Sequence, residues 1–204
     1  MSPVVIELPS LGARRVIASL PEFDVDDLLP ACEMLCQEGF SAWALPWERR
    51  DEIAPLAAVF GRRARIGVSG VTTAAQVSAA VEAGAAFAAC DFQLPRLVKA
   101  VTGFPVVLGG FTPTELRAGI EAGAAAVQLI PADAFDADYA RALPRMLGYP
   151  PLIVSGVLRR GLAAVWLESG AVGVWPDSLA NDGLIVASSL DGLRGELTLW
   201  HLDD

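Results

Sequence analysis

The sequence predicts a single (β/α)8 barrel, a TIM-barrel fold of the α/β class, over residues 1–204. Short apolar runs alternate with longer amphipathic segments, which is the pattern of parallel strands joined by helices. Two stretches, Val81–Phe87 and Ile120–Ala126, repeat one arrangement of a helix end, a glycine and a new strand. The alternative is an open doubly wound sheet, although no glycine-rich dinucleotide-binding loop follows the first expected strand.

Eight short apolar runs suit parallel strands that are buried on both faces of a barrel wall. They are Arg15–Leu20, Phe40–Leu45, Ala64–Val68, Ala86–Cys90, Pro105–Leu108, Ala125–Ile130, Leu152–Val154 and Ala171–Val174. Three helices between them have a capping residue ahead of the first turn and a glycine after the last. The expected caps are Asp24, Thr72 or Thr73, and Thr112, which is followed by Pro113 at the first helical position. The glycines are Gly39, Gly84 and Gly123.

Both ends of the chain depart from this repeat. Val4–Leu8 is expected to form either an extra strand or a cap across the bottom of the barrel. The segment 177–204 is atypical, because Leu184–Ala187 and Glu196–Leu202 alternate more as strands do than as an eighth helix would, and the sequence leaves its structure open. Leu190–Gly192 would then be a turn between two strands.

Composition excludes several classes of protein. A net charge of −9 disfavours nucleic acid as a partner, because binding to phosphates needs a basic patch. No apolar run approaches the roughly 18 residues of a membrane span, and no signal peptide is recognisable at the N-terminus. Three cysteines, Cys32, Cys36 and Cys90, fit a reducing compartment, so a cytoplasmic location is expected.

Four short segments carry a family resemblance by their order and spacing. They are Ile66–Val71, Gly109–Glu115, Val127–Ala132 and Val154–Val157. Together they resemble the 2-keto-3-deoxy-6-phosphogluconate (KDPG) and 4-hydroxy-2-oxoglutarate aldolases, over about Val16–Trp175. The resemblance implies a class I aldolase-like barrel, a homotrimer, and a keto acid or phosphorylated sugar acid as the ligand. It also implies seven ligand-binding positions, which are Gly70, Gly109, Gly110, Pro131, Ser155, Gly156 and Gly173.

Three catalytic roles of that family fall on unsuitable residues here. The family's Schiff-base lysine corresponds to Gln128, whose amide nitrogen is not nucleophilic. The proton-shuttling glutamate corresponds to Ala44, and the arginine that holds the pyruvate carboxylate corresponds to Glu48. A register shift of one or two residues would bring Arg49 or Arg50 to the arginine position. The sequence therefore predicts a degenerate member, a pseudo-enzyme without class I aldolase activity.

Other groups are expected near the carboxyl ends of the strands, where barrel enzymes place their active sites. Glu48, Asp91, Asp133 and Asp177 follow strands two, four, six and eight, and are candidate ligands for Mg²⁺. Such an ion would support the alternative function, a metal-assisted lyase or an isomerase. His201 is the only histidine, so an imidazole-rich zinc site is not expected. The only lysine, Lys99, is expected on a helix before strand five, and three tryptophans could narrow the mouth: Trp43, Trp47 and Trp175.

Val157 and Val174 replace the second glycines of two loops that the resemblance assigns to phosphate binding. Ser155 remains as a hydrogen-bond donor there, and Arg159 or Arg160 could supply positive charge. No cofactor is firmly implied.

Overall fold

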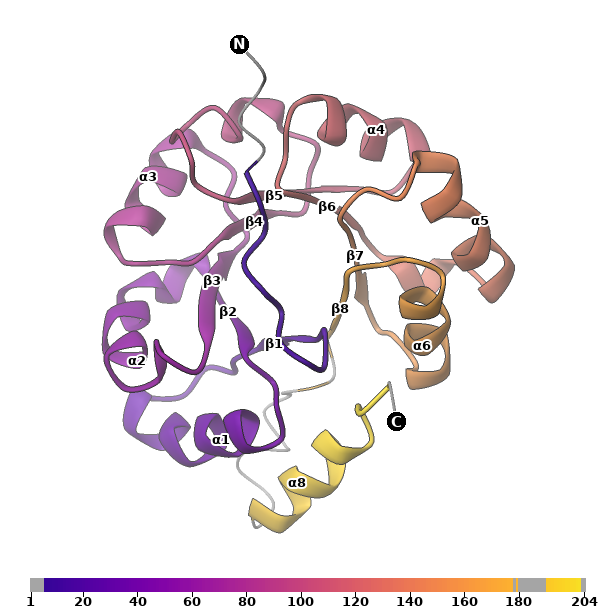
Figure 1. Cartoon of the computed structure of the whole chain (residues 1–204). Helices are drawn as coiled ribbons and strands as arrows, with labels where there is room; N and C mark the ends of the chain where they lie inside the picture. The colour runs from indigo at the N-terminus through magenta and orange to yellow at the C-terminus, as the bar shows by residue number, and fades with distance from the viewer. Residues whose placement is uncertain (1–5, 178, 180–189, 203–204) are drawn as a thin grey trace.

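The computed structural model describes residues 6–177, 179 and 190–202. Its strands form one eight-stranded parallel sheet in the order β1 to β8, and Val16 bridges Val174 to bring the first strand beside the last. The eight strands are β1 Ile17–Ser19, β2 Ala42–Pro46, β3 Arg65–Ser69, β4 Ala88–Cys90, β5 Val106–Gly110, β6 Ala126–Leu129, β7 Leu152–Gly156 and β8 Gly173–Pro176. This is a TIM barrel, and all eight expected strands are present (Figure 1).

Helices surround the barrel as an outer ring (Figure 1). They are α1 Val25–Gln37, α2 Ile53–Phe60, α3 Ala74–Glu82, α4 Pro113–Glu121, α5 Ala137–Leu147, α6 Arg160–Glu168 and α8 Leu190–Thr198. Three 3₁₀ helices occur as well, η1 Trp47–Glu52, η2 Pro95–Leu97 and η3 Ala132–Ala134. Thr73 and Thr112 each complete a capping box, with Gln76 and Glu115 respectively. Asp24 precedes α1 as expected, but its side chain makes no capping hydrogen bond.

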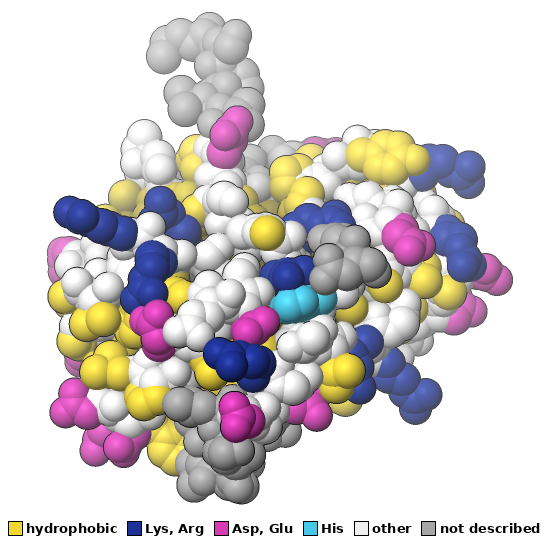
Figure 2. All heavy atoms as spheres, turned by 60° about the horizontal axis from the view of Figure 1, so that its bottom comes forward, with side chains coloured by type: hydrophobic (Ala, Val, Ile, Leu, Met, Phe, Trp, Pro, Cys, Tyr) yellow, Lys and Arg dark blue, Asp and Glu magenta, His cyan; other side chains and the backbone are white. Residues whose placement is uncertain are grey.

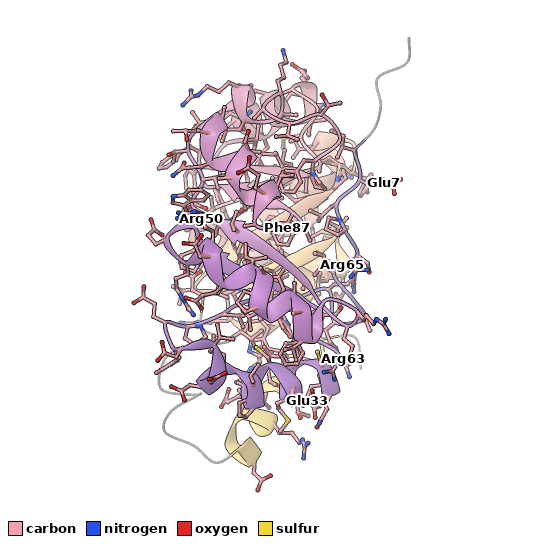
Figure 3. The ribbon with its side chains drawn as sticks, turned by 90° about the vertical axis from the view of Figure 1, so that its left-hand side faces the viewer. Glu7, Glu33, Arg50, Arg63, Arg65 and Phe87 are labelled. Carbon is pink, nitrogen blue, oxygen red and sulfur yellow. The ribbon has the colours of Figure 1, made fainter. Side chains whose placement is uncertain are left out.

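Side chains of the strands alternate between two cores, as the two-residue period of a strand requires. On β6, Val127 and Leu129 pack outward against the helices. Ala126 points inward with Phe87 and Trp175, whose rings meet edge to face inside the barrel. Figure 3 shows Phe87 between the two ends of the barrel, with Arg50 towards one end and Glu7 at the other.

The amino-terminal segment runs across the bottom of the barrel (Figure 1). Leu8 and Leu11 pack against the inward-facing core, and the described residues from Ile6 onwards form no strand there. Of the two expectations for Val4–Leu8, the structure therefore supports the cap for residues 6–8, while Val4 and Val5 lie outside the described residues.

The expectation for the carboxyl-terminal segment was wrong where it can be checked. Residues 190–198 form helix α8, so Leu190–Gly192 begins a helix and Glu196–Leu202 is not a strand. Leu193, Leu197 and Trp200 are buried at helical spacing, and α8 packs beside α1 (Figure 1). The face that comes forward when this side is turned towards the viewer carries both acidic and basic side chains (Figure 2). Tertiary packing of this apolar face overrides the local alternation. The other expected strand, Leu184–Ala187, lies outside the described residues.

The segment before β5 also differs from expectation. It contains only the short η2, and Lys99 follows η2 in an exposed turn instead of lying on a helix. Leu97 and Val98 are buried and anchor this connection to the core, while Pro95 is exposed. In the part of the chain that is described, no helix is long and apolar enough to cross a membrane.

Candidate ligand site at the carboxyl end of the barrel

A cavity of about 160 Å³ opens at the carboxyl ends of the strands. Six strands contribute to it, either by their last residues or by the residue that follows. Its lining residues are Ser19, Ser69, Asp91, Gln128, Ile130, Ser155, Trp175 and Asp177. We call this space the mouth cavity. It lies where TIM-barrel enzymes carry out their chemistry.

Gln128 and Ser155 are the two buried polar residues of the described core, each 2% exposed. Gln128 points into the barrel because its neighbours Val127 and Leu129 point outward. Its Nε2 donates a hydrogen bond of 2.6 Å to Ser155 Oγ on the adjacent strand β7. Its Oε1 has no hydrogen-bond partner among the described residues. A buried acceptor without a partner is costly, so this oxygen is a candidate contact for a ligand.

Two carboxylates lie at the exposed rim of the mouth cavity, Asp91 after β4 and Asp177 after β8. Partial burial raises the pKa of Asp91. Partial burial also raises the pKa of Asp177, and the negative charges of Asp133 and Asp91 raise it further. The mouth cavity is therefore acidic, and no cationic side chain of the described residues is among its lining.

The other two carboxylates expected at this mouth do not line the cavity. Asp133 turns aside, where its Oδ1 accepts a hydrogen bond of 3.0 Å from the Val157 N–H. Glu48 lies exposed on η1, which directly follows β2, and it is not among the lining residues. Within the described ranges, no group of three histidine, cysteine or acidic side chains could hold a metal ion. The expected four-carboxylate set is thus not assembled.

The residues that the resemblance assigns to the other aldolase roles do not reach the mouth cavity either. Ala44 is 1% exposed and belongs to the core inside the barrel, where it offers no polar group. Arg49 cannot serve the mouth cavity, because its guanidinium donates to the carbonyl oxygens of Leu20, Pro21 and Phe23 and pairs with Glu52. Arg50 lies over the Trp47 ring at 4.5 Å.

The structure explains in different ways why glycine occupies the positions that the resemblance implies. A Cβ on Gly109 would lie 2.4 Å from the Asp91 backbone, so this glycine allows β5 to approach the end of β4. A Cβ on Gly110 would lie 2.9 Å from the Glu115 Cβ, at the start of α4. Gly70 and Gly156 have φ angles of 77° and 133°, which disfavour other residues.

Gly173 lies away from the mouth cavity. A Cβ there would lie 2.2 Å from Leu11, at the opposite end of the barrel from the mouth cavity. Its small size therefore serves packing under the amino-terminal cap, and it is not among the residues that line the mouth cavity. Pro131 follows the lining residue Ile130 and is itself not in the lining.

Sequence reasoning missed Ser19 at this site. Trp175 Nε1 donates a hydrogen bond of 2.8 Å to Ser19 Oγ, which joins β8 to β1 at the mouth. The available signal was the position of Ser19 at the carboxyl end of the first expected strand. Of the three tryptophans expected to narrow the mouth, only Trp175 lines the cavity. Trp43 is buried in the outer core, where its Nε1 donates to the Phe40 carbonyl.

Comparison with known proteins finds similar aldolases by sequence and by structure. No family model matches the chain. The chain is 28% identical over 167 residues to the 2-dehydro-3-deoxy-6-phosphogalactonate aldolase of Escherichia coli (strain K12), which covers 78% of this chain and 80% of that protein.

Solved structures agree with that match. A native KDPGal structure superimposes with a TM-score of 0.79 and 25% identity, covering 91% of both chains. A KDPG aldolase from Legionella pneumophila, with pyruvate captured as a covalent carbinolamine, gives a TM-score of 0.77 at 20% identity and covers 90% of this chain and 92% of that one. Taken together with the barrel and the ordered motifs, these similarities support membership of the KDPG aldolase family.

Proposed function

We propose that this member of the family has no class I aldolase activity and uses the mouth cavity to bind a small molecule. The observation that carries the proposal is the buried amide of Gln128, which is bonded to Ser155 at the position that the resemblance assigns to the family's lysine. A carboxamide nitrogen shares its lone pair with the carbonyl group, so it cannot attack a ketone to form a carbinolamine or an imine.

The surrounding residues support the same conclusion. Ala44 has no proton to transfer, and Glu48 carries the wrong charge to hold a carboxylate. Lys99, the only lysine of the sequence, is exposed in the turn after η2 and does not line the mouth cavity. Nucleophile, proton shuttle and carboxylate clamp are therefore replaced together.

A metal-assisted lyase or isomerase is the second candidate. Asp91 and Asp177 share the mouth cavity, and Mg²⁺ is often held by one or two carboxylates with water completing its shell. A divalent ion there would polarise a substrate carbonyl in place of an imine. This candidate requires activity that disappears with a chelator.

Two properties implied by the resemblance also stay proposals, the homotrimer and the cytoplasmic location. Light scattering of the purified chain would test the first, with a mass near three times 21.4 kDa as the expected result. Fractionation of the native cell would test the second.

The deciding experiment is an assay of pyruvate release from three substrates: KDPG, its 6-phosphogalactonate counterpart and 4-hydroxy-2-oxoglutarate. Each is tested with Mg²⁺ and with a chelator, beside an active aldolase. In parallel, pyruvate and borohydride are added and the intact mass is measured. We expect no release and no reduced adduct. Release that resists the chelator would overturn the proposal, and release that needs Mg²⁺ would establish the second candidate.

A further inference from the structure

The negative charge of the mouth cavity limits the class of ligand that can bind there. Asp91 and Asp177 are its charged lining residues in the described chain, and neither has a cationic partner there. A keto acid or a sugar phosphate would bring a second negative charge beside them. Like charges without a neutralising partner oppose binding, so the family's ligand class does not suit this lining.

The unpaired Gln128 Oε1 points to the same conclusion by hydrogen bonding. Nε2 donates one of its N–H groups to Ser155, whereas Oε1 has no partner among the described residues, so the buried atom that a ligand must satisfy is an acceptor. The ionised oxygens of a keto acid are acceptors as well and cannot satisfy it. A ligand that suits Gln128 must instead donate a hydrogen bond.

We propose that the mouth cavity binds a small organic ammonium ion, with Gln128 Oε1 and the carboxylates of Asp91 and Asp177 accepting its N–H groups. This inference rests on the proposed function, in which position 128 no longer carries a lysine. An ammonium group has three donors and no acceptor, and its charge complements the two aspartates. The raised pKa values of both aspartates agree, since each carboxylate lies near negative charge or in a partly desolvated place without a compensating cation.

Size and lining favour an organic ion over a bare metal ion. The mouth cavity of about 160 Å³ matches roughly five water molecules at their share of liquid volume, which suits a ligand of about four to six non-hydrogen atoms. Ile130 and Trp175 give apolar wall that a carbon chain can contact. The hydroxyls of Ser19 and Ser69 can bind a polar group at the other end of the ligand.

The test is calorimetric titration of the whole chain with ethanolamine hydrochloride at constant ionic strength. Ethylene glycol, glycolate and MgCl₂ serve as neutral, anionic and metal comparators. We expect saturable binding of ethanolamine and no binding of the three comparators. D91N, D177N and Gln128→Leu should each weaken it by at least about tenfold, while D138N, at an exposed carboxylate on α5, should leave it unchanged. Cooperative unfolding of every variant shows that it is folded.

Each other result has a defined meaning. Binding of glycolate without ethanolamine would overturn the ammonium assignment, and so would Mg²⁺ binding that D91N or D177N abolishes. Ethanolamine binding that none of the three variants changes would place the amine elsewhere and also overturn it. If none of the four compounds binds, the ammonium assignment is also overturned. None of these results restores aldolase chemistry, whereas pyruvate release in the assay above overturns the proposed function whatever ethanolamine does.

Discussion

Gln128 Nε2 and Ser155 Oγ are 2.6 Å apart across the neighbouring strands β6 and β7, at the floor of the mouth cavity. Both residues are 2% exposed, so their bond is formed away from bulk water. It holds the amide with its nitrogen on the barrel wall and its oxygen free. One hydrogen bond thus decides which atom of residue 128 meets a ligand.

Replacing Gln128 by lysine should restore imine formation with pyruvate without restoring aldol cleavage. A primary amine at this position can attack a ketone, but Ala44 and Glu48 still supply neither proton transfer nor a carboxylate clamp. After borohydride reduction, intact mass should show a pyruvate adduct on the variant and none on the native chain. The adduct should form faster at higher pH, since only the neutral amine is nucleophilic.

The control is the same variant with Lys99→Arg, which removes the other lysine side chain. The adduct should persist in this double variant, because Lys99 is exposed and remote from the lining of the mouth cavity. An adduct that disappears with Lys99 would mean that position 128 is not in reach of a ketone.

Asp177→Asn should stabilise the protein at neutral pH. Burial and the charges of Asp133 and Asp91 raise the pKa of Asp177, so the folded state holds this proton more tightly than the unfolded chain does. The native carboxylate therefore costs stability above its raised pKa and costs none at acid pH, where both states are protonated. We expect Tm to rise by roughly 1–2 °C at pH 7, with the gain shrinking as the pH falls.

Thermal unfolding at several pH values measures this difference, with Asp138→Asn as the matched control. Asp138 is 93% exposed and lies 3.0 Å from Arg141, so its neutralisation should bring no gain. A gain at Asp177 that is equally large at pH 3 would contradict the charge argument. A charge that lowers stability is often kept at a functional site, because the function needs it.

The barrel could be predicted from sequence because its information is local. Every strand is a short apolar run, and caps such as Thr73 and Thr112 act within one helical turn. The α8 helix could not be predicted, since its alternating pattern becomes helical only when Leu197 and Trp200 are buried in the packed core. Local pattern and tertiary burial compete there, and burial wins.

The sequence predicted which residues lie near the mouth of the barrel, but it did not predict their hydrogen-bond partners. Gln128 and Asp177 follow from the order of the strands, and both line the mouth cavity. The hydrogen bond from Gln128 to Ser155 joins residues 27 apart in the chain, and no spacing announces it. Asp133 shows the same limit, because only the fold reveals that the Val157 N–H draws its carboxylate away.

Gly67→Ala should destabilise the barrel from inside. A Cβ at this position would lie 2.5 Å from the Phe87 ring, which is fully buried inside the barrel and meets Trp175 edge to face. Overpacking of this kind costs about 1–3 kcal/mol. Denaturant unfolding should show the loss, and Phe87→Leu in the same chain should relieve part of it, giving a positive coupling in a double-mutant cycle.

Gly195→Ala is the control for that prediction. Gly195 lies within α8 and a Cβ there would meet no atom within 4 Å. Alanine in a helix interior should therefore stabilise by about 0.5–1 kcal/mol. Equal effects at the two glycines would show that backbone freedom, and not contact with Phe87, determines the result.

Arg49→Ala should cost stability instead of ligand affinity. The Arg49 side chain is 9% exposed and bonds three carbonyl oxygens of the β1–α1 connection, those of Leu20, Pro21 and Phe23. Removing it takes the Arg49 donors from these carbonyls, of which the Pro21 carbonyl still accepts from the Phe23 N–H. We expect a loss of about 2–3 kcal/mol in the free energy of unfolding. Arg141→Ala, at a 61% exposed pair, should change it by less than about 0.5 kcal/mol.

The same variant separates two roles for this arginine. If Arg49 held a substrate carboxylate, as a shifted register would require, its loss would weaken the binding of an anion and change stability little. Its contacts place it instead between η1 and the end of β1, away from the lining of the mouth cavity. Titration of Arg49→Ala with ethanolamine should therefore give the native affinity once the variant is folded, because no donor or acceptor of the cavity has been changed.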